Sequence, residues 1–120
     1  MGEALRRTAM SLRCVKLSEK QKRELASYLL KLKKLNVTEV YLFGSRVHGV
    51  PFEDSDLDII VVSEEFGKRS FIENMQLLSE LWDGSFTIEA FPYTPEQIRK
   101  YKWRKVTVTE ALEKGIKIEL

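Results

Sequence analysis

The first clear pattern in the sequence is a run of apolar residues at helical spacing. Between residues 18 and 36 these side chains fall on one side of a helix: Leu25, Tyr28, Leu29, Leu32 and Leu35. Ser18 and Gln21 precede them with the spacing of a capping box, as N-cap and third helical residue. The pattern predicts an amphipathic helix that starts after Ser18, ends near Asn36 and exposes lysines. Residues 1–17 show no comparable pattern, so their structure is left open.

Segments rich in β-branched and aromatic residues predict three strands, at Val37–Phe43, Leu57–Val62 and Phe86–Phe91. The second segment is an almost continuous apolar run, which indicates a strand covered on both faces. The final stretch, Ile116–Leu120, alternates between apolar and charged residues and fits a short terminal strand or a tail.

Further helices are expected between and after these strands. Arg46–Val50 fits a short helix, and Ser70–Trp82 fits an amphipathic one with an apolar side: Phe71, Met75, Leu78 and Leu81. From Thr94 the chain offers an N-cap, a proline at the first helical position and a glutamine at the third. A last helix is expected at Thr107–Lys114, with Gly115 as its stop. The order predicts an α/β fold, a small mixed β-sheet flanked by helices.

Composition narrows the classes of function. A chain of 120 residues with 43% apolar residues fits one domain, 1–120, with a core of its own. The net charge of +2, from 20 basic and 18 acidic residues, gives no overall signal for nucleic acid or for an anionic membrane. Cys14 is the single cysteine, so no internal disulfide is expected. With no apolar stretch that suits a signal or a membrane span, we expect a cytoplasmic protein.

Two acidic residues stand at the start of the second predicted strand. Because side chains at i and i+2 of a strand point to the same side, Asp56 and Asp58 are expected to project together. Two carboxylates held this close repel each other, and a divalent cation removes the conflict. Mg²⁺ prefers oxygen ligands and often takes one or two carboxylates together with substrate phosphates. Acidic turns are common, so this pair alone is a weak signal.

Two further features strengthen the signal for a metal and phosphate site. Gly44 and Ser45 close the first predicted strand, and ten residues separate Ser45 from Asp56. Glycine lets the backbone approach a ligand, and a helix that starts there would offer N–H groups to a phosphate, with Arg46 as an added charge. Glu89 lies within the third predicted strand, where a buried carboxylate needs a partner. It meets the two aspartates if the strands are neighbours; otherwise it faces outward from a half-exposed strand.

These residues resemble the signature of the DNA polymerase beta-like nucleotidyltransferase superfamily, and most closely its minimal nucleotidyltransferase branch of small single domains. Gly44, Ser45, Asp56 and Asp58 match the family's Gly-Ser, ten-residue spacing and Asp-x-Asp. Later segments also resemble the family's third strand, C-terminal helix and tail. The resemblance covers about residues 20–120 and implies the nucleotidyltransferase fold.

The resemblance also implies a reaction. A nucleoside monophosphate, most commonly AMP from ATP, would pass to a hydroxyl group with release of pyrophosphate. The triphosphate would bind at residues 44–46. Asp56, Asp58 and Glu89 would be the catalytic residues and would hold two Mg²⁺ ions, with Mn²⁺ as a substitute. The family commonly has Asp where this chain has Glu89, which moves the carboxylate by one methylene.

The acceptor is not given by the sequence. The resemblance implies a cognate HEPN-type toxin, either modified on a tyrosine or neutralised by contact alone with a weak or inactive enzyme. Transfer to a small molecule is a third reading. The segment Arg99–Lys105, where basic residues are interleaved with Tyr101 and Trp103, is the local candidate for a docking surface; the simpler reading is a solvated face. Base preference and homo-oligomerisation stay open.

Overall fold

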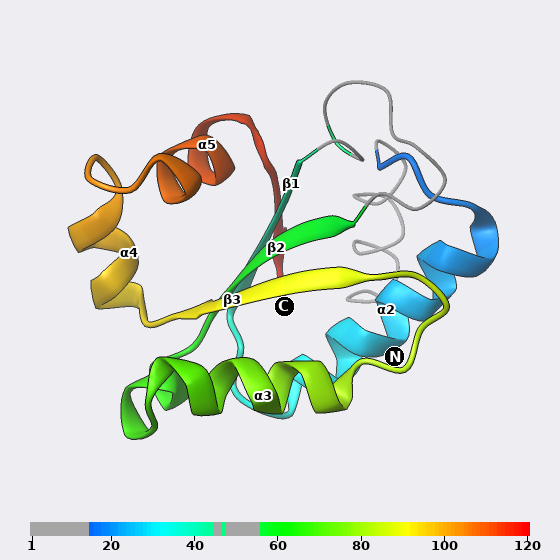
Figure 1. Ribbon diagram of the computed structural model, residues 1–120, viewed down its shortest axis with the longest axis horizontal. Coiled ribbons are helices and arrows are strands. Elements are labelled where there is room, and N and C mark those ends of the chain that lie inside the picture. Colours follow the sequence, from blue (N-terminus) through cyan, green and yellow to red (C-terminus); the bar gives the residue numbers. More distant parts are fainter. Residues whose placement is uncertain (1–14, 45–46, 48–55) are drawn as a thin grey trace.

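The computed structural model describes residues 15–44, 47 and 56–120, and in these residues the centre is one four-stranded sheet (Figure 1). In chain order the strands are β1 (Glu39–Phe43), β2 (Leu57–Val62), β3 (Ile88–Tyr93) and β4 (Ile116–Glu119). Their spatial order is β3-β2-β1-β4. β1 runs antiparallel to β2 and β4, whereas β2 and β3 run parallel. The predicted α/β fold with a small mixed sheet is therefore confirmed.

Helices cover both faces of this sheet (Figure 1). The described helices are α2 (Glu19–Lys33), the 3-10 helix η2 (Glu64–Lys68), α3 (Phe71–Leu81), α4 (Pro95–Tyr101) and α5 (Val106–Lys114). α2 and α3 pack on one face, in an apolar cluster that includes Leu29, Leu78 and Ile59. α5 packs on the other face, where Val108 meets Ile60, and α4 lies beside α5. None of the described helices is long and apolar enough to cross a membrane.

The alternation of β2 decides where its acidic residue points. Ile59 and Val61 belong to the cluster beneath α2 and α3, whereas Ile60 and Val62 belong to the cluster beneath α5. All four are buried, so the predicted strand covered on both faces is confirmed. Since side chains alternate along a strand, Asp58 lies on the α5 face of the sheet.

Local rules predicted the starts of α2 and α4 correctly. The N–H of Gln21 donates to Oγ of Ser18 at 3.1 Å, and the N–H of Ser18 donates to Oε1 of Gln21 at 2.9 Å. Thr94 and Gln97 form the same reciprocal pair at the start of α4, with Pro95 in its first turn. These contacts satisfy backbone donors that a helix N-terminus otherwise leaves unpaired.

Several boundaries differ from the sequence prediction. The first helix ends at Lys33, and Asn36 takes a φ of 59°, which a helix does not allow. The third strand starts at Ile88 because the carbonyl of Phe86 instead accepts a hydrogen bond from Nε1 of Trp82 at 2.8 Å. Phe71 was expected on the apolar side of its helix but is 42% exposed. The short helix expected at Arg46–Val50 lies outside the described residues.

Candidate active site

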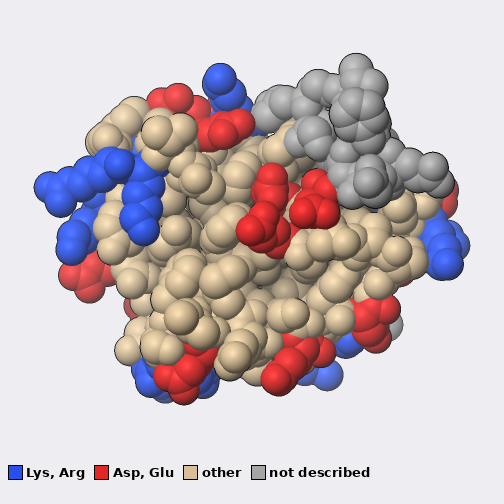
Figure 2. All heavy atoms as spheres, viewed as in Figure 1, with Lys and Arg blue, Asp and Glu red and all other residues tan. Residues whose placement is uncertain are grey.

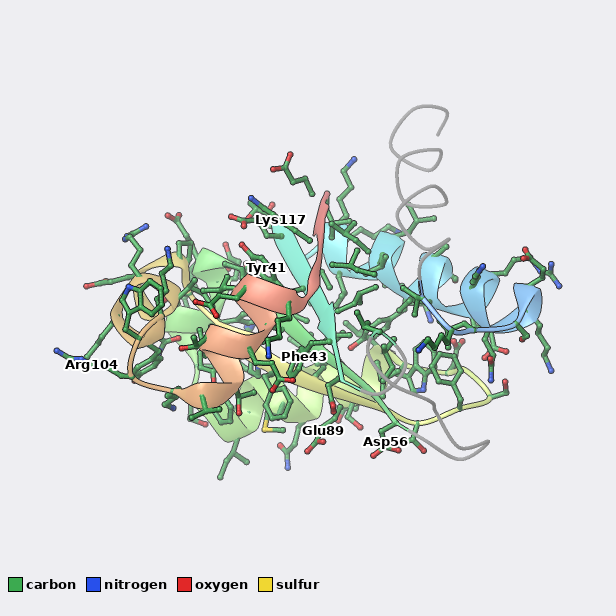
Figure 3. All side chains as sticks on the ribbon, turned by 90° about the horizontal axis from the view of Figure 1, so that it is seen from above. Tyr41, Phe43, Asp56, Glu89, Arg104 and Lys117 are labelled. Atoms are coloured by element: carbon green, nitrogen blue, oxygen red, sulfur yellow. The ribbon has the colours of Figure 1, made fainter. Side chains whose placement is uncertain are left out.

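Three carboxylates gather on the α5 face of the sheet, where β2 and β3 begin. The parallel register places Asp58 directly opposite Glu89, and Asp56 precedes Asp58 by one intervening residue. Asp58 is half-buried, whereas Asp56 and Glu89 are exposed. Figure 3 shows Asp56 and Glu89 along the same edge of the molecule, and Figure 2 shows acidic side chains grouped near the middle of the face seen there.

This crowding changes the acidity of Asp58. The pKa of Asp58 is raised to about 6, first by burial, then by the negative charges of Glu89 and Asp56, and also by a hydrogen bond to Glu89 and the charge of Glu110. A hydrogen bond between two carboxyl groups requires a proton on one of them. At neutral pH these neighbouring carboxyl groups concentrate negative charge, which a bound cation would relieve.

We expect Asp58→Asn to stabilise the protein at about pH 8 and to have little such effect at about pH 4. The pKa of Asp58 in the folded protein lies above the ordinary value of 3.8, so the protonated carboxyl contributes stability below 3.8 that is lost as the pH rises through about 6. Asparagine carries no charge and avoids that loss. Because the group is only half-buried, solvent screening limits the gain to about 1 kcal/mol.

Urea unfolding of the metal-free protein in a chelating buffer measures this difference at both pH values. The low-pH measurement serves as the internal control. An equal difference between Asp58→Asn and wild type at the two pH values would contradict the crowding of carboxylates as its cause.

Gly44 brings the backbone against these carboxylates. It follows Phe43, which pairs with Asp58 across β1 and β2, and has a φ of 95°. A β-carbon at this position would lie 2.5 Å from Oδ2 of Asp58. The chain turns directly afterwards, since the N–H of Val47 donates to the carbonyl of Gly44 at 3.0 Å. Both the backbone conformation and the close approach therefore require glycine.

The structure thus brings together Gly44, Asp56, Asp58 and Glu89 from the residues that the sequence singled out. Ser45 and Arg46 lie outside the described residues. Sequence reasoning did not identify Glu110 of α5, whose charge reaches Asp58. The only signal for it was its place between Val108 and Ala111, which both turn out to be buried against the sheet.

The donor set suits a hard divalent cation. Within the part of the chain that the structure describes, no three His, Cys, Asp or Glu side chains form a ready-made metal cage. Mg²⁺ does not require one, because it commonly takes one or two carboxylates and completes its shell with phosphate and water oxygens. Asp58 and Glu89 share a hydrogen bond whose proton a cation would replace, and the exposed carboxylate of Asp56 lies near enough to act on Asp58. The residues present therefore fit the ion.

Comparisons with known proteins agree with this geometry. The family model described as a nucleotidyltransferase domain matches residues 22–119. A crystal structure from Sulfolobus solfataricus, of a protein assigned provisionally as a nucleotidyltransferase, is similar with a TM-score of 0.51 and 20% identity, over 83% of this chain and 84% of that chain. At this identity the likeness concerns the fold alone. No match was found among the curated proteins. The model match spans most of the chain, which therefore belongs to the nucleotidyltransferase domain family.

Proposed function

We propose that this domain is a Mg²⁺-dependent enzyme of the minimal nucleotidyltransferase branch, which transfers AMP from ATP to a hydroxyl group. The observation that supports it most is the pairing of the half-buried Asp58 with Glu89, beside Asp56 and against the backbone of Gly44. A structural role alone would favour fewer charges at this place, because crowded carboxylates destabilise the fold.

The triphosphate of ATP lies, in this proposal, between the end of β1 and the carboxylates. Its β- and γ-phosphates rest on the turn at Gly44 and Ser45, with Arg46 adding positive charge, and its α-phosphate faces Asp58. The roles of Ser45 and Arg46 rest on the family resemblance alone. Gly44 supports this placement because it has no side chain and its backbone already lies against the Asp58 carboxylate.

The reaction is an in-line displacement at the α-phosphorus. The acceptor oxygen forms a bond to the α-phosphorus. The bond between the α-phosphorus and the oxygen that bridges it to the β-phosphate breaks, and pyrophosphate leaves with that oxygen. Bound Mg²⁺ neutralises phosphate charge and makes the acceptor hydroxyl more acidic. Asp56 and Asp58 hold the ions and so orient the triphosphate. Glu89, exposed beside Asp58, contributes a further ligand and accepts the hydroxyl proton.

The acceptor in this proposal is a protein hydroxyl, and the family resemblance favours a tyrosine of a cognate HEPN-type toxin. The exposure of Asp56 and Glu89 supports a large acceptor, because the carboxylates are reachable from outside without a deep entrance. Neutralisation of such a toxin by contact alone, with a weak or inactive enzyme, and transfer to a small molecule are the alternatives.

Two measurements test the proposal. Calorimetric titration with ATP should show binding that depends on Mg²⁺; equal binding without the ion would contradict the metal site.

Co-expression with a HEPN-type toxin encoded beside this chain, followed by intact-mass measurement, should show mass gains in steps of one AMP on the toxin. A tight, neutralising complex with no mass gain would favour contact alone. No complex would direct the search to small-molecule acceptors.

Glu89→Gln should slow transfer by about 100-fold or more while ATP still binds with Mg²⁺, because the amide cannot accept the proton but Asp56 and Asp58 remain. Glu89→Asp restores the residue common in the family and should retain more activity than Glu89→Gln. Transfer rates with radiolabelled ATP, paired with calorimetry, separate the two effects. Full activity of Glu89→Ala would show that Glu89 is an ordinary exposed strand residue.

A further inference from the structure

The end of α4, the turn after it and the first residue of α5 form a strongly basic corner, residues 99–106. Five cations lie there: Arg99, Lys100, Lys102, Arg104 and Lys105. Within residues 15–44, 47 and 56–120, the ion pairs formed by the chain involve none of these five. Figure 2 shows basic side chains gathered at the end of the molecule where α4 lies. No ion pair with a described acidic side chain therefore neutralises these cations.

Apolar side chains stand at the centre of this basic corner. Trp103 is 72% exposed and Val106 is 82% exposed. Both line an open hollow of about 420 Å³, which Glu110 and Glu113 of α5 also line. A large indole left in water beside a hollow of this kind is typical of a surface that a partner covers.

The basic corner is held in one shape. The carbonyl of Tyr101 accepts hydrogen bonds from the N–H groups of Arg104 and Lys105, each at 3.0 Å. The hydroxyl of Thr109 in α5 donates to the carbonyls of Lys102 and Lys105. Nζ of Lys105 also lies 4.3 Å from the centre of the Tyr101 ring. A partner would therefore meet a surface that is already ordered, and binding would cost less conformational entropy.

The basic corner and the carboxylates are neighbours but not one site. Glu110 lines the hollow and its charge reaches Asp58, so α5 connects the two. Figure 3 nevertheless places Arg104 well to one side of Asp56 and Glu89. A ligand that touches both places must therefore be large, whereas a protein surface of ordinary interface size, about 800 Å² on each partner, spans such a separation.

We propose that the basic corner docks an acidic surface of the protein that accepts AMP, with Trp103 and Val106 at the centre of the contact. This inference rests on the proposed function for the acceptor being a protein. A nucleic acid fits less well, because its backbone carries negative charge throughout and Glu110 and Glu113 in the hollow repel it, and Val106 offers no ring for stacking. A protein surface carries both signs of charge, so it can set its acidic residues against the five cations and other residues against these two glutamates. An apolar centre with an aromatic anchor, surrounded by charges of both signs, is typical of protein interfaces.

A labelled random copolymer of glutamate and tyrosine is a suitable probe, because it offers carboxylates together with tyrosine rings. Fluorescence anisotropy with the full chain should detect binding that weakens as salt is raised. Arg104→Glu combined with Lys105→Glu should weaken binding by about tenfold or more, and so should Trp103→Ala. Lys20→Glu combined with Arg23→Glu is the matched control, since it reverses two exposed cations on α2, and it should bind like wild type.

Calorimetry with ATP and Mg²⁺ on the same variants separates this inference from the proposed function. Loss of copolymer binding with ATP binding intact supports the basic corner as a docking surface. Three results would overturn it: no copolymer binding by wild type, an equal loss in the α2 control, or displacement of the copolymer by single-stranded oligoadenylate at lower concentrations than by unlabelled copolymer. Failure of wild type to bind ATP with Mg²⁺ would instead contradict the proposed function.

Discussion

Replacing both Asp56 and Asp58 by asparagine is expected to abolish transfer of AMP, with a fall in rate of about 1,000-fold or more, while the domain stays folded. Asp56 directly precedes β2 and Asp58 is its second residue, and Glu89 alone cannot hold ions and orient the triphosphate. Asn keeps the size of each side chain and its capacity to accept hydrogen bonds. The loss would therefore report on charge rather than on packing.

This double substitution should also separate activity from stability. Asp58 is half-buried among other acids, and its pKa is raised to about 6. The ionised form of Asp58, which activity requires, therefore destabilises the metal-free fold. We expect the inactive variant to melt at the same temperature as wild type or higher at about pH 8. A coupled loss of activity and melting temperature would mean that the aspartates support the fold instead.

A matched control removes the same number of carboxylates elsewhere. Glu64→Gln combined with Glu80→Gln changes two exposed acids, one in η2 and one in α3, away from the α5 face. Transfer by this variant should equal that of wild type. If it falls by a factor similar to that of the aspartate pair, overall charge and not the site near Asp58 determines the rate.

The parts of the fold that follow local rules were predictable from the sequence. A capping box depends on four consecutive residues, and those at Ser18 and Thr94 were both predicted and found. The strand at Leu57–Val62 was also predicted at its observed bounds, since a short, almost continuous apolar run rich in β-branched residues is typical of a buried strand. These features need no knowledge of what the chain packs against.

The position of Glu89 depends on tertiary structure and could not be predicted in the same way. Its strand starts and ends two residues later than the pattern predicted. The indole N–H of Trp82 donates a hydrogen bond to the carbonyl of Phe86, so this carbonyl does not take part in the β-sheet hydrogen bonds. Only the parallel register with β2 places Glu89 opposite Asp58. Sequence alternation left both orientations open, since a carboxylate in a strand can face water as readily as another carboxylate. The contribution of Glu110 likewise appears only once α5 is packed on the sheet.

Gly44→Ala is expected to lower the affinity for ATP with Mg²⁺ by about 100-fold or more and to destabilise the fold by about 1 to 2 kcal/mol. With a φ of 95°, Gly44 has a backbone conformation that residues with a β-carbon rarely adopt, and a β-carbon would lie 2.5 Å from Oδ2 of Asp58. The added methyl group must therefore displace either the turn or the carboxylate. Either movement disturbs the place where the proposed phosphate and metal sites meet. Gly44→Val should have a larger effect in the same direction.

Gly67→Ala is the matched control, because a β-carbon there meets only Cγ2 of Thr94, at the ordinary contact distance of 3.6 Å. Calorimetry well below the melting temperature keeps both variants folded, so affinity is measured separately from stability. Lower stability with unchanged ATP affinity in Gly44→Ala would show that the glycine serves the turn alone. The phosphates would then have to bind elsewhere than at the end of β1. Loss of affinity in Gly44→Ala but not in Gly67→Ala would support the triphosphate at this turn, because only Gly44 lies against the Asp58 carboxylate.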